Sequence, residues 1–192
     1  MAGDGADQVA DPLTLKILDV VVALMREGGL AAVTTESVSA AASVSKATIY
    51  RRWPSMSKLV AEAATHAFPE VEVPDLGDVI AELRWFLTAR IRQYAVPGSA
   101  RLVASLIGAS VSDDHVQSFF RDWVSGQSLS SRAVFERAAA RGDFPASLDI
   151  DDLRTVMSAP VMFRAVAENG APDEALVETT LTVLRALMVS GT

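Results

Sequence analysis

The chain has 192 residues, of which 50% are hydrophobic and none is Cys, and its formal net charge is −7. This length and apolar content suffice for a buried core in one domain or in two small ones. Without Cys the chain has no disulfides, no thiol chemistry and no Cys-ligated zinc. Its two His are too far apart in sequence to form a metal-ligand pattern.

The sequence gives no sign of export or of a membrane anchor. The first residues are acidic and lack the cationic start and the apolar run of a signal peptide. The longest tempting apolar stretch, residues 102–112, is too short and too rich in Ser and Gly to span a bilayer. We therefore expect a cytoplasmic protein that does not enter a membrane.

The negative charge is unevenly distributed along the chain. Residues 1–11 contain three Asp, residues 12–66 contain six Lys or Arg and four Asp or Glu, and residues 67–192 contain eleven Lys or Arg and seventeen Asp or Glu. Only the middle segment is therefore net positive. The acidic remainder argues against nonspecific coating of nucleic acid, but not against a local cationic surface.

The first predicted helix runs from about Pro12 to Arg26. It follows a tail, residues 1–11, that has little to bury and is expected to be disordered. Pro suits the first turn of a helix, Asp11 can cap it, and apolar residues recur at helical spacing. Gly28-Gly29 is expected to end this helix, because Gly readily adopts the left-handed conformation of a helix cap.

Residues 34–59 predict a helix-turn-helix followed by the start of a supporting helix. Either Thr34 or Thr35 can cap the first helix of the pair, and residues 43–45 form the turn. The second helix is expected over residues 46–52, after a Ser that can cap it. A Trp-Pro pair comes next, and Pro disfavours helical geometry in the residue before it.

The exposed face of this second helix has the side chains that a short recognition helix in the major groove needs. Cations and hydroxyls can bind phosphates and base edges, and an aromatic ring can pack on the sugar-phosphate backbone. A small amphipathic helix pair that binds nothing is the alternative interpretation. The candidate DNA contacts are Thr34, Thr35, Ser45, Lys46, Thr48, Tyr50, Arg51 and Lys58.

Several residues in and around the motif form a pattern that is known from other proteins: Gly28-Gly29-Leu30, Val33-Thr34, Val38, Ala41-Ala42, Val44 to Ser55, and Leu59. Over about residues 13–60 the chain resembles the N-terminal DNA-binding domain of TetR/AcrR-family transcription regulators. The resemblance implies an all-helical homodimer that binds a double-stranded DNA operator. It also implies that the last two helices form the dimer interface and that a small-molecule pocket in the C-terminal part controls DNA binding.

Two positions depart from the usual pattern of that family, and both bear on DNA affinity. The turn usually contains Gly where this chain has Ser43, and a left-handed Ser costs on the order of 1 kcal/mol relative to Gly. The following helix often has a Lys that touches phosphate where this chain has Met56. Lys58 stands two residues further on, at a different side of the helix.

The C-terminal part is predicted to be helical after residues 69–74, which are interpreted as a linker flanked by prolines. Helices are expected over residues 75–95, 99–110, 113–141, 149–169 and 172–190. The third has a weak middle, and the fourth contains Pro160, which should kink it. The whole chain therefore reads as all-α with about nine helices, with a helix-turn-helix domain over residues 12–68 and a helical regulatory and dimerisation domain over residues 69–192.

Large side chains in the C-terminal part are candidates for an apolar ligand pocket, with ordinary core packing as the alternative. Arg90 shares a helix face with Phe86 and Tyr94. If it is buried it needs an acidic partner or an anionic ligand; otherwise its stem lies along the core and its head reaches water. The candidates are Trp85, Phe86, Arg90, Tyr94, Ile107, Phe119, Trp123, Met157 and Met162.

The last two helices have apolar stripes that suit a dimer interface, although the same faces could complete the core of one subunit. A twofold operator needs two recognition helices about 34 Å apart, one turn of DNA. The candidate faces are Val156, Met157, Val161 and Phe163 with Leu181, Leu184 and Met188.

The sequence therefore favours a ligand-responsive transcription regulator without a cofactor or metal, and a repressor in particular. An enzyme is disfavoured, because the sequence has no Glu-x-x-His pair, no Gly-rich phosphate loop and no nucleophile-base set. The remaining alternative is a helical interaction protein that has lost DNA binding, which Ser43 and Met56 would favour.

Overall fold

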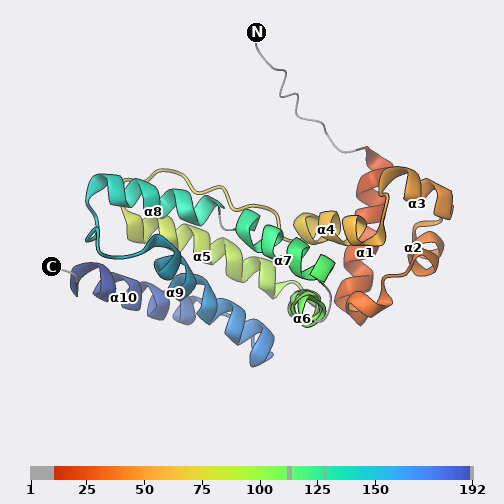
Figure 1. The fold of residues 1–192 in the computed structure, drawn as a ribbon. Helices are drawn as coiled ribbons and strands as arrows, with labels where there is room; N and C mark the ends of the chain where they lie inside the picture. The colour runs from red at the N-terminus through yellow and green to blue at the C-terminus, as the bar shows by residue number, and fades with distance from the viewer. Residues whose placement is uncertain (1–10, 112–113, 128, 191–192) are drawn as a thin grey trace, which may run out of the picture.

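The computed structural model describes residues 11–111, 114–127 and 129–190, and within these ranges the chain is all-helical. The molecule is elongated, with α1–α4 at one end, α8–α10 towards the other, and α6 and α7 between them (Figure 1). Ten α-helices occur in the described ranges: α1 (Pro12–Gly28), α2 (Thr35–Ala42), α3 (Lys46–Arg52), α4 (Met56–Ala67), α5 (Val79–Ala95), α6 (Ser99–Ser110), α7 (Asp114–Gln127), α8 (Leu129–Arg141), α9 (Ile150–Met162) and α10 (Glu174–Ser190).

The prediction of about nine helices is corrected to ten, because the stretch predicted as one helix over residues 113–141 contains two. Helix α7 ends at Gln127 and α8 begins at Leu129. The sequence at this point is rich in Ser and Gly, which are weaker helix formers than Ala or Leu. Residues 113 and 128 lie outside the described ranges, as does the tail that was predicted to be disordered, apart from Asp11.

Helix α1 has the predicted capping residues. The Asp11 carboxylate accepts a hydrogen bond from the backbone N–H of Leu13 at 3.3 Å. At the other end Gly29 has φ 69° and ψ −168°, a positive-φ conformation that suits Gly but is not the predicted left-handed helical one, and its N–H donates to the carbonyl of Met25 at 2.9 Å. The predicted start is confirmed, and the helix extends slightly beyond the predicted end, to Gly28.

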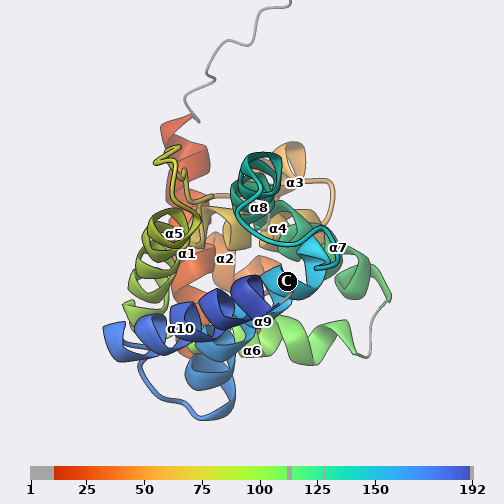
Figure 2. The same cartoon turned by 90° about the vertical axis from the view of Figure 1, so that its left-hand side faces the viewer.

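Buried apolar side chains form two clusters, and the boundary between these clusters does not coincide with the predicted domain border at residue 68. The first cluster combines α1–α4 with Leu102, Val103 and Leu106 of α6. The second combines α5, α8, α9 and α10, which stand in front of the N-terminal helices when the molecule is viewed along its long axis (Figure 2). Helix α6 therefore packs with the N-terminal helices. The domain border at residue 68 stays a prediction.

The predicted linker, residues 69–74, has neither helix nor strand. Immediately after it, the backbone N–H of Leu76 donates to the Glu82 carboxylate at 3.2 Å. Glu82 is completely buried and forms ion pairs with Arg137 at 2.8 Å and with Arg141 at 3.4 Å. A buried carboxylate is tolerated when it is paired and hydrogen-bonded, so Glu82 connects the linker region with α5 and α8.

Helix α9 continues through Pro160 to Met162, and the chain then forms a π-helical turn over Phe163–Ala167. Pro160 removes one backbone hydrogen bond from the turn that precedes it. The kink at Pro160 stays a prediction. Helix α10 then returns along α9 and also contacts α5 (Figure 1). None of the described helices is long and apolar enough to cross a membrane.

Candidate functional site

The turn between α2 and α3 contains Ser43 in the left-handed conformation, with φ 57° and ψ 47°. Non-Gly residues adopt this conformation rarely. Two hydrogen bonds hold the turn in place: the N–H of Val44 donates to the carbonyl of Ser39 at 3.1 Å, and the hydroxyl of Ser39 donates to the carbonyl of Val44 at 2.5 Å. A Ser thus occupies the position where the resembling family usually has Gly, and the turn is retained.

Capping residues fix the starts of α2 and α3. Thr34, and not Thr35, caps α2. Its hydroxyl accepts from the N–H of Ser37 at 3.1 Å, and the Ser37 hydroxyl accepts from the N–H of Thr34 at 2.9 Å. Ser45 caps α3 by accepting from the N–H of Thr48 at 3.1 Å. The predicted Ser45 cap is confirmed, and three of the candidate DNA contacts, Thr34, Ser45 and Thr48, take part in these capping hydrogen bonds.

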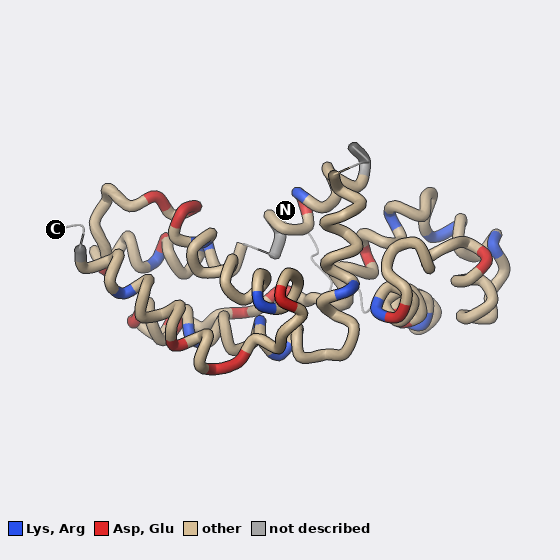
Figure 3. Tube along the Cα trace, turned by 90° about the horizontal axis from the view of Figure 1, so that it is seen from below, with Lys and Arg blue, Asp and Glu red and all other residues tan. Residues whose placement is uncertain are grey.

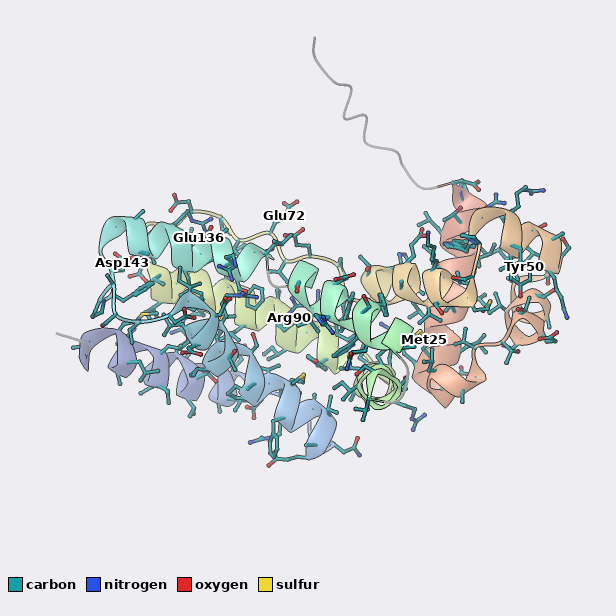
Figure 4. The ribbon with its side chains drawn as sticks, in the orientation of Figure 1. Met25, Tyr50, Glu72, Arg90, Glu136 and Asp143 are labelled. Carbon is teal, nitrogen blue, oxygen red and sulfur yellow. The ribbon has the colours of Figure 1, made fainter. Side chains whose placement is uncertain are left out.

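The outer face of α3 lies at the end of the molecule, where Figure 4 shows Tyr50. Tyr50 is 50% exposed, and its hydroxyl lies 2.9 Å from the hydroxyl of Thr35 on α2. Lys46 is exposed and forms an ion pair with Glu36, and its hydrogen bond lowers the pKa of the Glu36 carboxyl. Arg51, the next residue along α3, is also exposed. The fold therefore joins Tyr50 to Thr35 and leaves Lys46, Tyr50 and Arg51 of α3 exposed.

The inner face of α3 is anchored by Ile49, which is completely buried. Arg52 also turns inward and joins α3 to the start of α1. It donates to the Asp11 carboxylate at 2.6 Å and to the hydroxyl of Thr14 at 3.3 Å. The hydrogen bond from Arg52 lowers the pKa of the Asp11 carboxyl. Nothing in the sequence pattern indicates this link, because its partners are 41 residues apart.

Lys58 lies apart from the other candidate contacts. It is exposed on α4 and lines a groove between α4 and α7, together with Trp53 and Asp122. Met56 is half-buried against the first apolar cluster. Figure 3 shows Lys and Arg positions together with a few Asp and Glu positions at the α2–α4 end of the molecule, and both kinds of charge over the part that holds α5 and α8–α10.

A cavity of about 110 Å³ lies between the end of α4 and helices α5–α9. Its wall brings together five of the nine candidate pocket residues, from α5, α7 and α9. Residues from α6 and α8 complete it. The five candidate residues in the wall are Phe86, Arg90, Tyr94, Trp123 and Met162.

Phe68 also lines the cavity, and it directly follows α4. It is buried, and its ring centroid lies 5.4 Å from that of Tyr94 and 5.8 Å from that of Trp123, edge to face in both pairs. The sequence pattern does not mark Phe68 as a cavity residue, because it ends the predicted N-terminal domain and looks like an ordinary core residue. Through Phe68 the cavity touches the end of α4, whose buried residues share the first apolar cluster with Ile49 of α3.

The other four candidate pocket residues lie outside the cavity. Trp85 is 53% exposed, and its ring N–H donates to the carbonyl of Glu72 at 3.0 Å. Ile107 and Phe119 pack against the first apolar cluster, and Met157 is completely buried in the second. Helical spacing identifies apolar faces but does not say which neighbour each face meets, so it could not separate these residues from the lining.

Arg90 gives the cavity its charge. Its Cζ lies 5.1 Å from the centroid of the Phe86 ring, and one of its N–H groups donates to the side-chain oxygen of Gln93 at 2.7 Å. Burial lowers the pKa of the Arg90 guanidinium and raises the pKa of the Tyr94 hydroxyl. Figure 4 shows Arg90 in the middle of the molecule, far from Tyr50. Within the described residues no group of three His, Cys, Asp or Glu could hold a metal ion.

Most of the apolar residues predicted to form a dimer interface are buried within the single chain. Met157, Val161, Leu181, Leu184 and Met188 belong to the second apolar cluster. For these five the alternative interpretation, that they complete the core of one subunit, is the correct one. The same part of the chain exposes other large apolar side chains, which we call the outer apolar face: Met162, Phe163, Val183 and Leu187.

Two family models match the chain. One, described as bacterial regulatory proteins of the tetR family, matches residues 17–63. The other, described as tetracyclin repressor-like, C-terminal domain, matches residues 73–184. The first covers the helix-turn-helix, and the second covers α5–α9 and the greater part of α10.

Relatives and solved structures agree with these matches. An uncharacterised HTH-type transcriptional regulator of Mycobacterium tuberculosis is 28% identical over 171 residues, covering 87% of this chain and 83% of the relative. The crystal structure of the TetR family transcription regulator SCO0332 superposes with a TM-score of 0.71 at 25% identity, covering 92% of this chain and 98% of that one. A TetR transcriptional regulator from Agrobacterium tumefaciens has the same fold, with a TM-score of 0.74 at 20% identity and coverage of 92% and 94%.

Proposed function

Because the chain belongs to the TetR family of bacterial regulatory proteins and is a DNA-binding transcription regulator, we propose that it acts as a ligand-responsive repressor that binds a palindromic operator as a homodimer. The observation that carries this proposal is that Phe68 belongs both to the cavity wall and to the end of α4. It directly follows α4, whose buried residues share the first apolar cluster with Ile49 of α3. The family and the names of the relatives indicate a regulator rather than an enzyme. The cytoplasmic location stays a prediction.

In this proposal α3 enters the major groove. Lys46 and Arg51 contact phosphates, and Tyr50 packs on the backbone while held by Thr35. Few cations face the DNA on each subunit, so each subunit contributes few released counterions to the affinity. A dimer doubles these contacts. Dimerisation is therefore expected to supply much of the operator affinity.

The dimer would form through the outer apolar face. Phe163 is 59% exposed, and Val183 and Leu187 on α10 are also exposed in the single chain. Exposed large apolar side chains are typical of protein–protein contacts. Pairing of this face with its twofold mate would leave α3 of each subunit at the far end of the molecule, available to neighbouring turns of DNA.

Ligand binding would reach α3 by way of α4 and α1. A ligand that displaces Phe68 acts directly on the end of α4. A second contact involves Arg101 of α6, which donates to the carbonyls of Arg26 and Glu27 at the end of α1, at 3.3 Å and 2.5 Å. The ligand releases DNA only if it binds the non-binding arrangement of the dimer more tightly than the DNA-bound one.

Substitutions on α3 test this proposal. With an operator obtained by selection from random duplexes, Lys46→Ala and Tyr50→Ala are each expected to remove most operator binding and to leave the dimer intact. Arg121→Ala, an exposed cation on α7, is the matched control and should bind normally. Unchanged affinity in both α3 variants would contradict the proposal and would favour the helical interaction protein that has lost DNA binding.

A further inference from the structure

The wall of the cavity at the end of α4 combines several aromatic rings with one positively charged side chain. Its large surfaces are aromatic rings contributed by Phe68, Phe86, Tyr94, Phe120 and Trp123. Among the described residues that line it, Arg90 is the one charged side chain, and neither Asp nor Glu is present. A molecule that fills the cavity therefore meets flat apolar surfaces and a positive charge.

The Arg90 guanidinium is placed to receive an anion. It lies over the Phe86 ring at 5.1 Å and is oriented by its hydrogen bond to Gln93. A guanidinium has five N–H donors in a fixed fork and matches a carboxylate in a bidentate way. The partial burial of this charge favours an anionic ligand further, because opposite charges attract more strongly where water is excluded.

Trp123 contributes its ring to the same wall, where it packs edge to face on Phe68 with 5.8 Å between the ring centroids. Its indole Nε1 is buried and closed off from the cavity. Arg90 is therefore the charged donor that a molecule in the cavity can reach.

The size of the cavity limits the rest of the molecule. Its volume is about 110 Å³, and an apolar cavity of roughly 150 Å³ is known to accept benzene. One ring with a short substituent is therefore the appropriate scale. We propose that the effector is a small aromatic monocarboxylate, with its ring among the aromatic side chains and its carboxylate on Arg90. This inference rests on the proposed ligand-responsive function and specifies the ligand of that site.

Calorimetric titration of the full chain with three probes of equal size tests the ligand class: benzoate, the neutral benzamide and the cationic benzylamine. Benzoate is expected to bind at least tenfold more tightly than benzamide, and benzylamine not to bind. Equal binding of benzoate and benzamide, or no benzoate binding by the folded protein, would overturn the inference.

Variants on α5 test the role of the guanidinium. Arg90→Met keeps an apolar stem and is expected to weaken benzoate at least tenfold while benzamide binding stays the same. Arg90→Lys keeps the charge but loses the bidentate geometry, and should retain part of the benzoate affinity. This second variant keeps the test decisive if Arg90→Met folds poorly. Arg92→Met is the matched control, because Arg92 is exposed on α5 outside the cavity. Unchanged benzoate affinity in the Arg90 variants would contradict the inference.

Operator release is measured separately, so that two failures can be told apart. Arg90-dependent benzoate binding that leaves operator affinity unchanged supports the ligand class and contradicts the ligand-responsive function. Release of the operator by benzamide or benzylamine, with no effect of benzoate, supports the function and overturns the ligand class.

Discussion

Glu36 on α2 forms an ion pair with Lys46 on the first turn of α3, so an acidic side chain neutralises one of the few cations that face outward at this end of the molecule. Both side chains are exposed, and the pair is therefore weak and open to competition from phosphate. In the proposed complex the Lys46 ammonium must leave the Glu36 carboxylate and bind a DNA phosphate instead. Glu36 would then reduce operator affinity without contributing much to folding.

Replacing Glu36 by Gln is expected to raise operator affinity about two- to fivefold at low salt, since an exposed ion pair is worth up to about 1 kcal/mol. The dependence of affinity on salt should become steeper, by up to about one released counterion per subunit. Fluorescence anisotropy at several salt concentrations measures both. Glu168→Gln removes an equal charge from an exposed pair with Arg164, far from α3, and should change neither. An equal rise in operator affinity in both variants would show that the net charge of the protein, and not the Glu36–Lys46 pair, sets the affinity.

The left-handed Ser43 predicts a stabilising substitution. Ser43→Gly relieves the strain of φ 57° and is expected to raise the unfolding free energy by up to about 1 kcal/mol. The greater conformational entropy of Gly in the unfolded chain offsets part of this gain. Ser118→Gly, at an exposed position inside α7, should lower it by about 0.5 kcal/mol. Chemical denaturation measures both. A Ser43→Gly variant less stable than the parent would mean that the Ser side chain itself holds the turn.

The buried Glu82 predicts a large loss of stability on truncation. Glu82→Ala removes the shared partner of Arg137 and Arg141 and the acceptor for the N–H of Leu76, and breaking a buried pair of this kind costs about 3–5 kcal/mol. The control is Glu178→Ala, which breaks an exposed pair with Arg84 and should cost less than about 1 kcal/mol. Similar midpoints of urea unfolding in the two variants would contradict the importance assigned to Glu82.

The outer apolar face predicts which residues hold the dimer. Leu187→Asp would bury a carboxylate in the proposed interface and is expected to convert the dimer to monomers in sedimentation velocity experiments. Val189→Asp is the matched control: Val189 is more exposed than Leu187 and lies on another side of α10. A Leu187→Asp variant that remains dimeric would place the interface elsewhere.

The local features of this fold could be predicted from the sequence because they depend on a few neighbouring residues. The Ser45 cap, the Asp11 cap and the stop at Trp53 each follow from short-range backbone chemistry, and the structure confirms them. The helix boundaries around the motif agree for the same reason. The break between α7 and α8 was visible as a weak segment, although it was predicted as a bend within one helix.

The features that depend on contacts between distant segments could not be read in the same way. Arg52 was not among the candidate contacts, and only the folded chain brings it to Asp11. Trp85 and Phe86 are neighbouring aromatic residues, and their orientation on the helix places Trp85 at the surface and Phe86 in the cavity wall. The apolar stripe of α10 was correctly identified as a contact face, but its partners are in the same chain.

The most direct test of the central claim is selection of bound duplexes from a random DNA library at moderate salt, with purified protein that has been shown to be folded and dimeric. The account predicts an enriched palindrome whose half-sites are about one helical turn apart, as two α3 helices in adjacent major grooves require. It also predicts that Tyr50→Ala enriches nothing. No enriched sequence with the parent protein, or an enriched site without twofold symmetry, would contradict an operator-binding homodimer.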